Sequence, residues 1–259
     1  MIKMKRLFAR SISEIISGAT RFSSPVEGFR VLMYHAIGAP ALGDSLGIFS
    51  VTPEKFRYQM TQLANYKRGE LTAFLEPMDL HAGNRVAVTF DDGYLDNFEV
   101  AGPIMVELNI PFTVFVVSEF IRNRKPGFLC QSSLRALASL PGAQIGSHGA
   151  NHLPLTKCDH KTLKNELLSS KHFLEDVLGK EVCTISYPYG AVDIRVRNAA
   201  LDAGYKQGAS SVAGLNMIGR DPMIFSRTEI HSYDNERVFS QKLKGNWDWY
   251  RWRTGDVCL

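Results

Sequence analysis

Short apolar runs alternate with amphipathic stretches along most of the chain. The apolar runs are rich in β-branched and aromatic residues, as buried strands are. Strands are therefore expected at 29–35, 85–90, 111–117, 143–147, 181–190, 205–211 and 224–233. In other stretches apolar residues recur at helical spacing, and helices are expected at 52–65, 97–110, 159–180 and 193–204.

Two of the expected helices carry start and stop signals. Thr52 stands where an N-cap is needed and Pro53 at the first helical position. The helix at 159–180 has a stop signal in Gly179. Alternation of strands and helices predicts an α/β fold with a mainly parallel sheet. The count of about seven strands suits a barrel or an open doubly wound sheet.

Composition and charge exclude several classes of protein. The chain has 259 residues, 45% hydrophobic and 22% charged, as an ordinary globular protein has. Its net charge of +4 is too small to indicate nucleic-acid binding. The 4 cysteines form no CxxC pair, so reduced thiols in a reducing compartment are expected. No apolar run reaches the length of about 18 residues that a transmembrane helix needs.

Both ends of the chain differ from a central domain expected at 29–240. Segment 1–28 is basic, and its apolar residues are too often interrupted for a signal-peptide core. It is expected to form a surface helix, with peripheral membrane contact as the alternative. The aromatic and basic tail, 241–259, either packs on the domain or meets sugar rings or a membrane interface. A cytoplasmic location follows, with the inner membrane face as the alternative.

Polar residues follow several expected strands at their carboxyl ends. Asp91 and Asp92 follow one strand, His148 follows another, and His35 ends the first. The sequence YPYG, 187–190, closes a fourth strand. Parallel α/β folds bind ligands at the carboxyl ends of their strands. The pattern therefore predicts one site built from these residues.

The sequence contains the residue types of a metal site, although each of them could also be present for a reason unrelated to metal binding. Asp92 precedes a glycine in a common turn pair, and His148 and His152 form one H-x-x-x-H pair in a chain with 7 histidines. Gly149 and Pro154 disfavour a helix, so the pair is expected on a loop or a single turn. Two histidines and one carboxylate, with positions left open, make a catalytic type of metal site.

The order of the motifs resembles a known family. TFDDG at 89–93, the histidine pair, and YPYG follow one another as in the polysaccharide deacetylases, carbohydrate esterase family 4 with NodB-like domains. The resemblance covers roughly residues 30–230. The opening VLMYHAIG, followed by VTPEKFRYQM, is similar to the branch associated with exopolysaccharide and surface-glycan synthesis. The resemblance implies a distorted (β/α) barrel, TIM-like, of about seven parallel strands.

Roles carry over to this sequence position by position. The resemblance implies that Asp92, His148 and His152 bind a divalent metal and that Asp91 is the general base for the attacking water. The backbone N–H of Tyr189 would help to hold the oxyanion. Zinc suits this ligand set best, with manganese, cobalt and nickel as alternatives.

The proton donor for the leaving amine is less directly indicated. The family usually has an L-x-H motif near the end of its domain, but here VLMYH at the start matches it, so His35 is the expected acid. His231, in TEIHSY, is the rival. Ser186 replaces an arginine that the family often has, and Arg227 is expected to supply the guanidinium that orients Asp91.

The expected function is metal-dependent hydrolysis of N-acetyl groups on amino sugars of a glycan or a lipid-linked precursor. The expected partner is thus a carbohydrate substrate, with no nucleic acid. One alternative is a C–N hydrolase of the same fold that opens the ring of a small cyclic amide or ureide. Another is a glycan-binding protein with a relic site, which the intact Asp91, Asp92, His148 and His152 disfavour.

Overall fold

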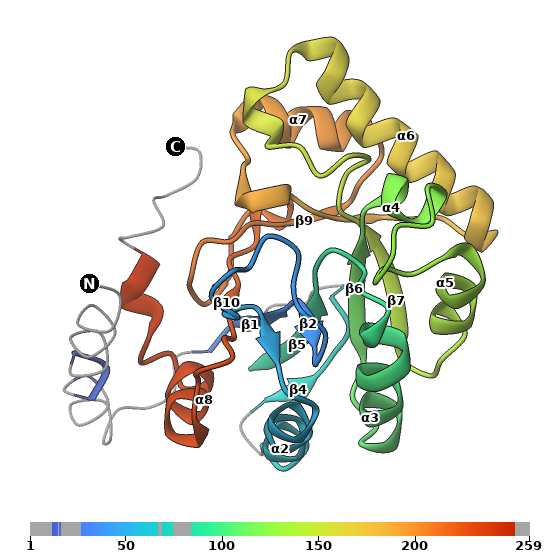
Figure 1. Cartoon of the computed structure of the whole chain (residues 1–259). Coiled ribbons are helices and arrows are strands. Elements are labelled where there is room, and N and C mark those ends of the chain that lie inside the picture. The colour runs from blue at the N-terminus through green and yellow to red at the C-terminus, as the bar shows by residue number, and fades with distance from the viewer. Residues whose placement is uncertain (1–11, 15, 17–26, 67–68, 75–83, 252–259) are drawn as a thin grey trace.

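One curled sheet of parallel strands organises the chain (Figure 1). The computed structural model describes residues 12–14, 16, 27–66, 69–74 and 84–251. Along the sheet the order is β10-β1-β5-β6-β7-β8-β9, and β4 also pairs with β5. The strands are β1 (Phe29–Tyr34), β4 (Glu70–Leu71), β5 (Arg85–Phe90), β6 (Phe112–Val116), β7 (Ala143–Ser147), β8 (Thr184–Ser186), β9 (Gln207–Ala209) and β10 (Thr228–Glu229). This curled path confirms the expected distorted barrel. A small second sheet pairs β2 (Ala36–Ile37) with β3 (Ser50–Val51).

Helices surround the sheet (Figure 1). They are α2 (Pro53–Ala64), α3 (Gly102–Glu107), α4 (Ser118–Arg122), α5 (Gln131–Ala138), α6 (His160–Leu178), α7 (Ile194–Asp202) and α8 (Glu236–Leu243). The predicted signals are at the ends of α2 and α6. The Thr52 side chain caps α2, and Gly179 ends α6 with a left-handed φ of 66°.

Several expected elements differ from the structure. The strands expected at 181–190 and 205–211 shorten to β8 and β9, and two further differences have a clear local cause. The helix expected at 97–110 starts as a π-helical turn, Asn97–Ala101, before α3 begins. Pro103 has no N–H to donate to the preceding turn, and the Gly102 N–H donates to the Asn97 carbonyl, five residues back. The strand expected at 224–233 shortens to β10, because a turn closed by the Asp234 carboxylate on the His231 N–H ends it.

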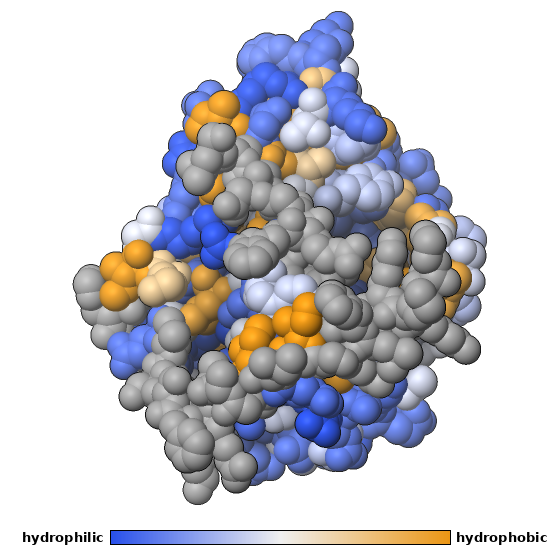
Figure 2. All heavy atoms as spheres, turned by 90° about the vertical axis from the view of Figure 1, so that its left-hand side faces the viewer, coloured by the Kyte–Doolittle hydropathy of each residue, from blue (hydrophilic) through white to orange (hydrophobic). Residues whose placement is uncertain are grey.

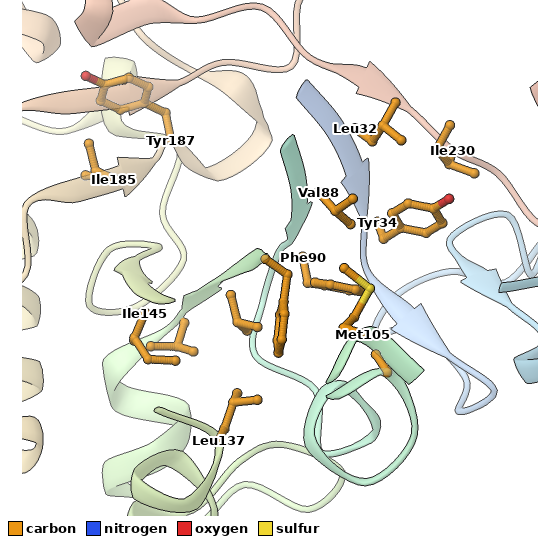
Figure 3. Packing of buried hydrophobic residues seen from close by; sticks show 14 of the residues in the cluster. Leu32, Tyr34, Val88, Phe90, Met105, Leu137, Ile145, Ile185, Tyr187 and Ile230 are labelled. Atoms are coloured by element: carbon orange, nitrogen blue, oxygen red, sulfur yellow. The ribbon is translucent and has the colours of Figure 1, made fainter. Parts of the chain in front are cut away.

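Alternation along the strands divides the core into two parts. Every second side chain along the strands faces the helices, and Figure 3 shows Leu32, Val88 and Ile185 among them. The side chains at the alternate positions pack with Phe74 and Phe225 on the concave side of the sheet: Phe29, Val31, Ala87, Phe115 and Ala209. The same two-residue period brings His35, Asp91 and His148 to the concave side at the carboxyl ends of β1, β5 and β7. The sheet thus gathers the polar residues at one end of an apolar interior.

The described part of the C-terminal tail packs on the sheet. Asp248 forms a bidentate ion pair with Arg30 of β1, with both N···O distances 2.9 Å. Most of segment 1–28 lies outside the described residues. In the described part of the chain no helix is both long and apolar enough to cross a bilayer. The face in Figure 2 is largely hydrophilic where it is described, with small separate hydrophobic areas.

Candidate active site

Three side chains meet at the carboxyl ends of β5 and β7. One ligand atom each from Asp92, His148 and His152 lies within 4.8 Å of the others. The Oδ1 atom of Asp92 is 3.5 Å from Nε2 of His148 and 3.2 Å from Nε2 of His152. The two histidines lie on a loop outside any helix, as Gly149 and Pro154 predicted.

The chemistry of this group fits a divalent cation. Nδ1 of His148 is 2.7 Å from the carbonyl oxygen of Ser186, and a carbonyl can only accept, so Nδ1 carries the proton. In the neutral ring Nε2 then presents its lone pair to Asp92. Oδ1 of Asp92 is buried without a hydrogen-bond partner among the described residues. Electron-pair donors that face one point in this way can hold a divalent cation between them.

The negative charge of the two aspartates affects the pKa of His148. Burial alone would lower the pKa of this imidazole, but the carboxylates of Asp91 and Asp92 raise it above its ordinary value. The site therefore attracts positive charge strongly.

Asp91 is held apart from the three ligands by a buried guanidinium. Arg227 donates to its two oxygens at 2.8 and 2.7 Å, and the Ser186 hydroxyl donates to it at 3.1 Å. Arg227 is fully buried and also donates to the Ser210 carbonyl at 2.8 Å. Burial would raise the pKa of Asp91, but Arg227, helped by His148, lowers it to about 2. Asp91 is thus a fixed carboxylate, with one oxygen 4.0 Å from Nε2 of His148.

Three residues of the site have left-handed backbone conformations. The φ angles of Asp92, His152 and Tyr189 are 73°, 60° and 59°. Such a conformation costs a residue with a side chain about 1–2 kcal/mol. Gly93 shares it with a φ of 77°, and a Cβ there would come within 2.8 Å of Val116. Local strain of this kind is typical of functional sites, where the surrounding fold enforces it.

Glu166 of α6 anchors the histidine loop, and sequence reasoning missed it. Its carboxylate accepts the N–H groups of Ala150 and Asn151 at 3.0 and 2.9 Å and the Asn151 side-chain amide at 2.6 Å. Glu166 is almost fully buried. In the sequence Glu166 is one of two glutamates on this helix, and its place beside Leu163 and Leu167 on the apolar face was the only signal.

Replacing Glu166 with Gln should weaken metal binding. Both backbone N–H groups bind one oxygen of Glu166 and the Asn151 side-chain amide binds the other, so the NH2 group of Gln would face a donor in either orientation and the loop between His148 and His152 would lose part of its anchor. Zinc affinity should fall by about 10- to 100-fold, as for other outer partners of metal ligands. Competition with a chromogenic chelator measures it. Glu175→Gln is the matched control: on the same helix Glu175 accepts the Val182 N–H at 3.0 Å. Equal zinc affinities of the two variants would contradict the anchoring role.

His35 and His231 both lie near the ring of Phe49, with ring centroids 4.9 and 6.0 Å from it. The two histidines differ in their partners. Nδ1 of His35 is buried without a hydrogen-bond partner among the described residues. Nε2 of His231 is 2.8 Å from the Glu229 carboxylate, and its Nδ1 is 3.5 Å from Nζ of Lys242. His35 is also close enough to Asp91 for its charge to contribute to the lowered pKa of that carboxyl.

Tyr189 lies at the edge of the site. Its ring centroid is 4.6 Å from that of His152, and 69% of the residue is exposed. All the residues expected at the site except His231 are therefore gathered around the Asp92 group, and His231 contacts Glu229, Phe49 and Tyr233 instead. The arrangement is of the class in which two histidines and a carboxylate can hold a metal beside a second, fixed carboxylate.

Comparisons with known proteins agree with this class. A family profile described as polysaccharide deacetylase matches residues 81–208. YxkH of Bacillus subtilis is 28% identical over 189 residues, which are 71% of this chain and 64% of YxkH. The peptidoglycan-N-acetylglucosamine deacetylase PgdA of Listeria monocytogenes is 34% identical over 116 residues, 43% of this chain and 23% of PgdA. The chain thus spans less than two thirds of these curated relatives.

A solved structure is similar over most of the fold. It is a polysaccharide deacetylase from Bacillus cereus, with a TM-score of 0.74 and 25% sequence identity over 85% of this chain and 69% of that one. The chain belongs to the polysaccharide deacetylase family.

Proposed function

We propose that this protein is a metal-dependent hydrolase that removes acetyl groups from N-acetylated amino sugars of a glycan or a lipid-linked glycan precursor. The observation that carries the proposal is the position of Asp91, held by Arg227, beside the group of Asp92, His148 and His152. An amide is a weak electrophile and its amine a poor leaving group. The chemistry that a bound divalent metal supplies is polarisation of the carbonyl and activation of water.

The protein's own residues divide the remaining tasks. Asp91 accepts the proton of the attacking water, and Arg227 with Ser186 fixes the direction of its free lone pairs. The N–H of Tyr189 donates to the developing oxyanion. His35 donates a proton to the departing amine, because its Nδ1 is not engaged by another described residue.

Acetate release is the direct test of this function. The zinc-loaded chain should release acetate and a free amino sugar from N-acetylated chito-oligosaccharides, and a chelator should stop the reaction. A parallel assay with a small cyclic ureide, in which ring opening is measured, distinguishes the deacetylase from a hydrolase of cyclic amides. Ring opening without acetate release, or zinc-free purified protein that cannot be loaded, would refute the proposal.

The choice of acid is tested with a pair of asparagine variants. His35→Asn should lower kcat by about 10²-fold, the smaller end of the contribution of a positioned acid, with little change in KM. His231→Asn should change kcat far less, because Glu229 and Lys242 already engage both ring nitrogens. Steady-state rates of acetate release measure both. A larger loss in His231→Asn would reverse the assignment.

A further inference from the structure

A half-buried lysine lies in an aromatic wall near the metal-binding group. Nζ of Lys125 is 3.5 Å from the ring centroid of Phe120 and 4.9 Å from that of Phe128. Its residue is partly exposed to solvent. Among the residues that the structure describes, no carboxylate forms a salt bridge with it. Cation–π contacts are thus the main attractive contacts of this ammonium group.

The aromatic wall connects Lys125 with the site. The ring centroid of Phe120 is 6.4 Å from that of His152. Phe128 stacks on Tyr94 at 4.7 Å, and the Tyr94 hydroxyl accepts the Leu42 N–H at 2.7 Å. Tyr94 and Phe128 also form an isolated antiparallel backbone bridge, and Tyr94 follows Asp92 by two residues. Tyr94 therefore lies beside Asp92, and the wall extends from there to Lys125.

Backbone hydrogen bonds fix the loop that carries Lys125. Leu129 donates its N–H to the Gly93 carbonyl, and Leu95 donates to the Gly127 carbonyl, both at 2.9 Å. Lys125 itself donates its N–H to the Phe120 carbonyl at 2.8 Å. The loop is thus tied to the turn directly after Asp92, so the ammonium group has a fixed place relative to the metal-binding residues.

The charge of Lys125 lacks a strong partner, although it is near the reacting centre. Burial lowers the pKa of Lys125, while the Asp92 carboxylate raises it and so favours the charged form. Aromatic rings stabilise an ammonium group through their faces but offer no oxygen or nitrogen acceptor. The N–H donors of Lys125 are therefore available to an oxyanion. An anion in this place would meet a cation that the fold has already desolvated in part.

We propose that Lys125 binds an oxyanion, a phosphate or a carboxylate, attached to the amino sugar or to its neighbour. The inference rests on the proposed function and adds the class of substrate: an acidic N-acetylated glycan or a sugar phosphate, preferred over a neutral polymer. Phe120, which is only partly buried and contacts both Lys125 and His152, flanks that sugar, and the ammonium group of Lys125 binds its anionic group.

Matched substrates and variants test the proposal on the full zinc-loaded chain. The substrates are a neutral N-acetylated chito-oligosaccharide, N-acetylglucosamine 1-phosphate, and an oligosaccharide containing N-acetylmuramic acid. The variants are Lys125→Met, Lys125→Arg and the control Lys180→Met, which removes an exposed lysine just beyond α6. Lys125→Met should raise KM for the phosphate or the carboxylate substrate by about 10- to 100-fold, the value of a charge-assisted hydrogen bond. KM for the neutral substrate and kcat for all three should stay within about twofold.

If Lys125→Met raises KM only for the sugar phosphate, the anion that Lys125 binds is a phosphate; if KM rises only for the muramic acid substrate, it is a carboxylate. Lys125→Arg should retain most of the affinity, and added salt should reduce the difference between wild type and Lys125→Met. Equal changes on neutral and anionic substrates, or none on any, would overturn the inference and leave Lys125 as a support for Phe120 alone.

Failure of the proposed function can be told apart from failure of this inference. Acetate release by the wild type from the neutral substrate tests the function without Lys125. Should no substrate be hydrolysed, calorimetric titration with N-acetylglucosamine 1-phosphate and N-acetylglucosamine still compares wild type with Lys125→Met. Equal binding of the phosphate by both proteins would then exclude the site.

Discussion

Asp91→Asn is expected to lower kcat for acetate release by about 10⁴-fold, the upper end of what a positioned base contributes. The amide keeps the shape of the side chain but cannot accept the proton of water. Metal content should stay near one per chain, because Asp91 is not among the three grouped ligands. Steady-state kinetics and metal analysis of the same preparation measure both quantities.

The variant also leaves the buried guanidinium of Arg227 without its carboxylate, so a lower free energy of unfolding is expected. Asp221→Asn is the control for loss of an aspartate–arginine pair, since Asp221 forms a more exposed pair with Arg197 at 2.8 Å outside the site. It should keep full activity. A fully active Asp91→Asn protein, or one that loses its metal, would show that the base has been misassigned.

Much of the site could be predicted from the sequence because strand ends determine it. Parallel strands direct their carboxyl ends to one edge of the sheet, so the sequence alone was enough to expect Asp91, Asp92 and His148 together. The loop conformation of the histidine pair was also predictable from Gly149 and Pro154. These features depend on local rules that operate within a few residues.

Long-range partners could not be predicted in the same way. Glu166 reaches the histidine loop from the middle of α6, and in the sequence it is one more glutamate on a helix. The helices α4 and α5, with 5 and 8 residues, are too short to carry a clear helical period, and no element was expected between β6 and β7. The contact between Lys125 and the aromatic wall depends on a turn at Gly93 that ties two loops together.

Arg227 was expected to supply the guanidinium that orients Asp91, and the structure shows how it reaches that carboxylate. Ser186 is too short to reach across the site as an arginine would, and the guanidinium enters instead from the segment before β10. The Ser186 hydroxyl and Nη2 of Arg227 are 2.9 Å apart, so both act on the same oxygen of Asp91. In this chain the guanidinium thus reaches Asp91 from the segment before β10 and not from position 186.

Asp92→Asn is expected to abolish stabilisation of the fold by zinc. Asparagine tolerates the left-handed φ of 73° at this position, so the backbone should be retained. Asn removes the carboxylate from the group of three candidate ligands, and the loss of affinity should exceed the roughly 10- to 100-fold cost of losing an outer partner. Wild type at a zinc concentration 100 times its Kd should gain about 2.7 kcal/mol of unfolding free energy. At that concentration the variant should gain almost nothing.

Chemical denaturation with and without zinc measures this difference without any substrate. Asp193→Asn is the control, because Asp193 caps α7 through the Val196 N–H at 2.8 Å and does not touch the site. That control should retain the full zinc-dependent gain. If Asp92→Asn retained it too, the two imidazoles would have to bind zinc without the carboxylate between them. The left-handed backbone at Asp92 would then serve the turn alone, and the buried, unpaired Oδ1 would need another explanation.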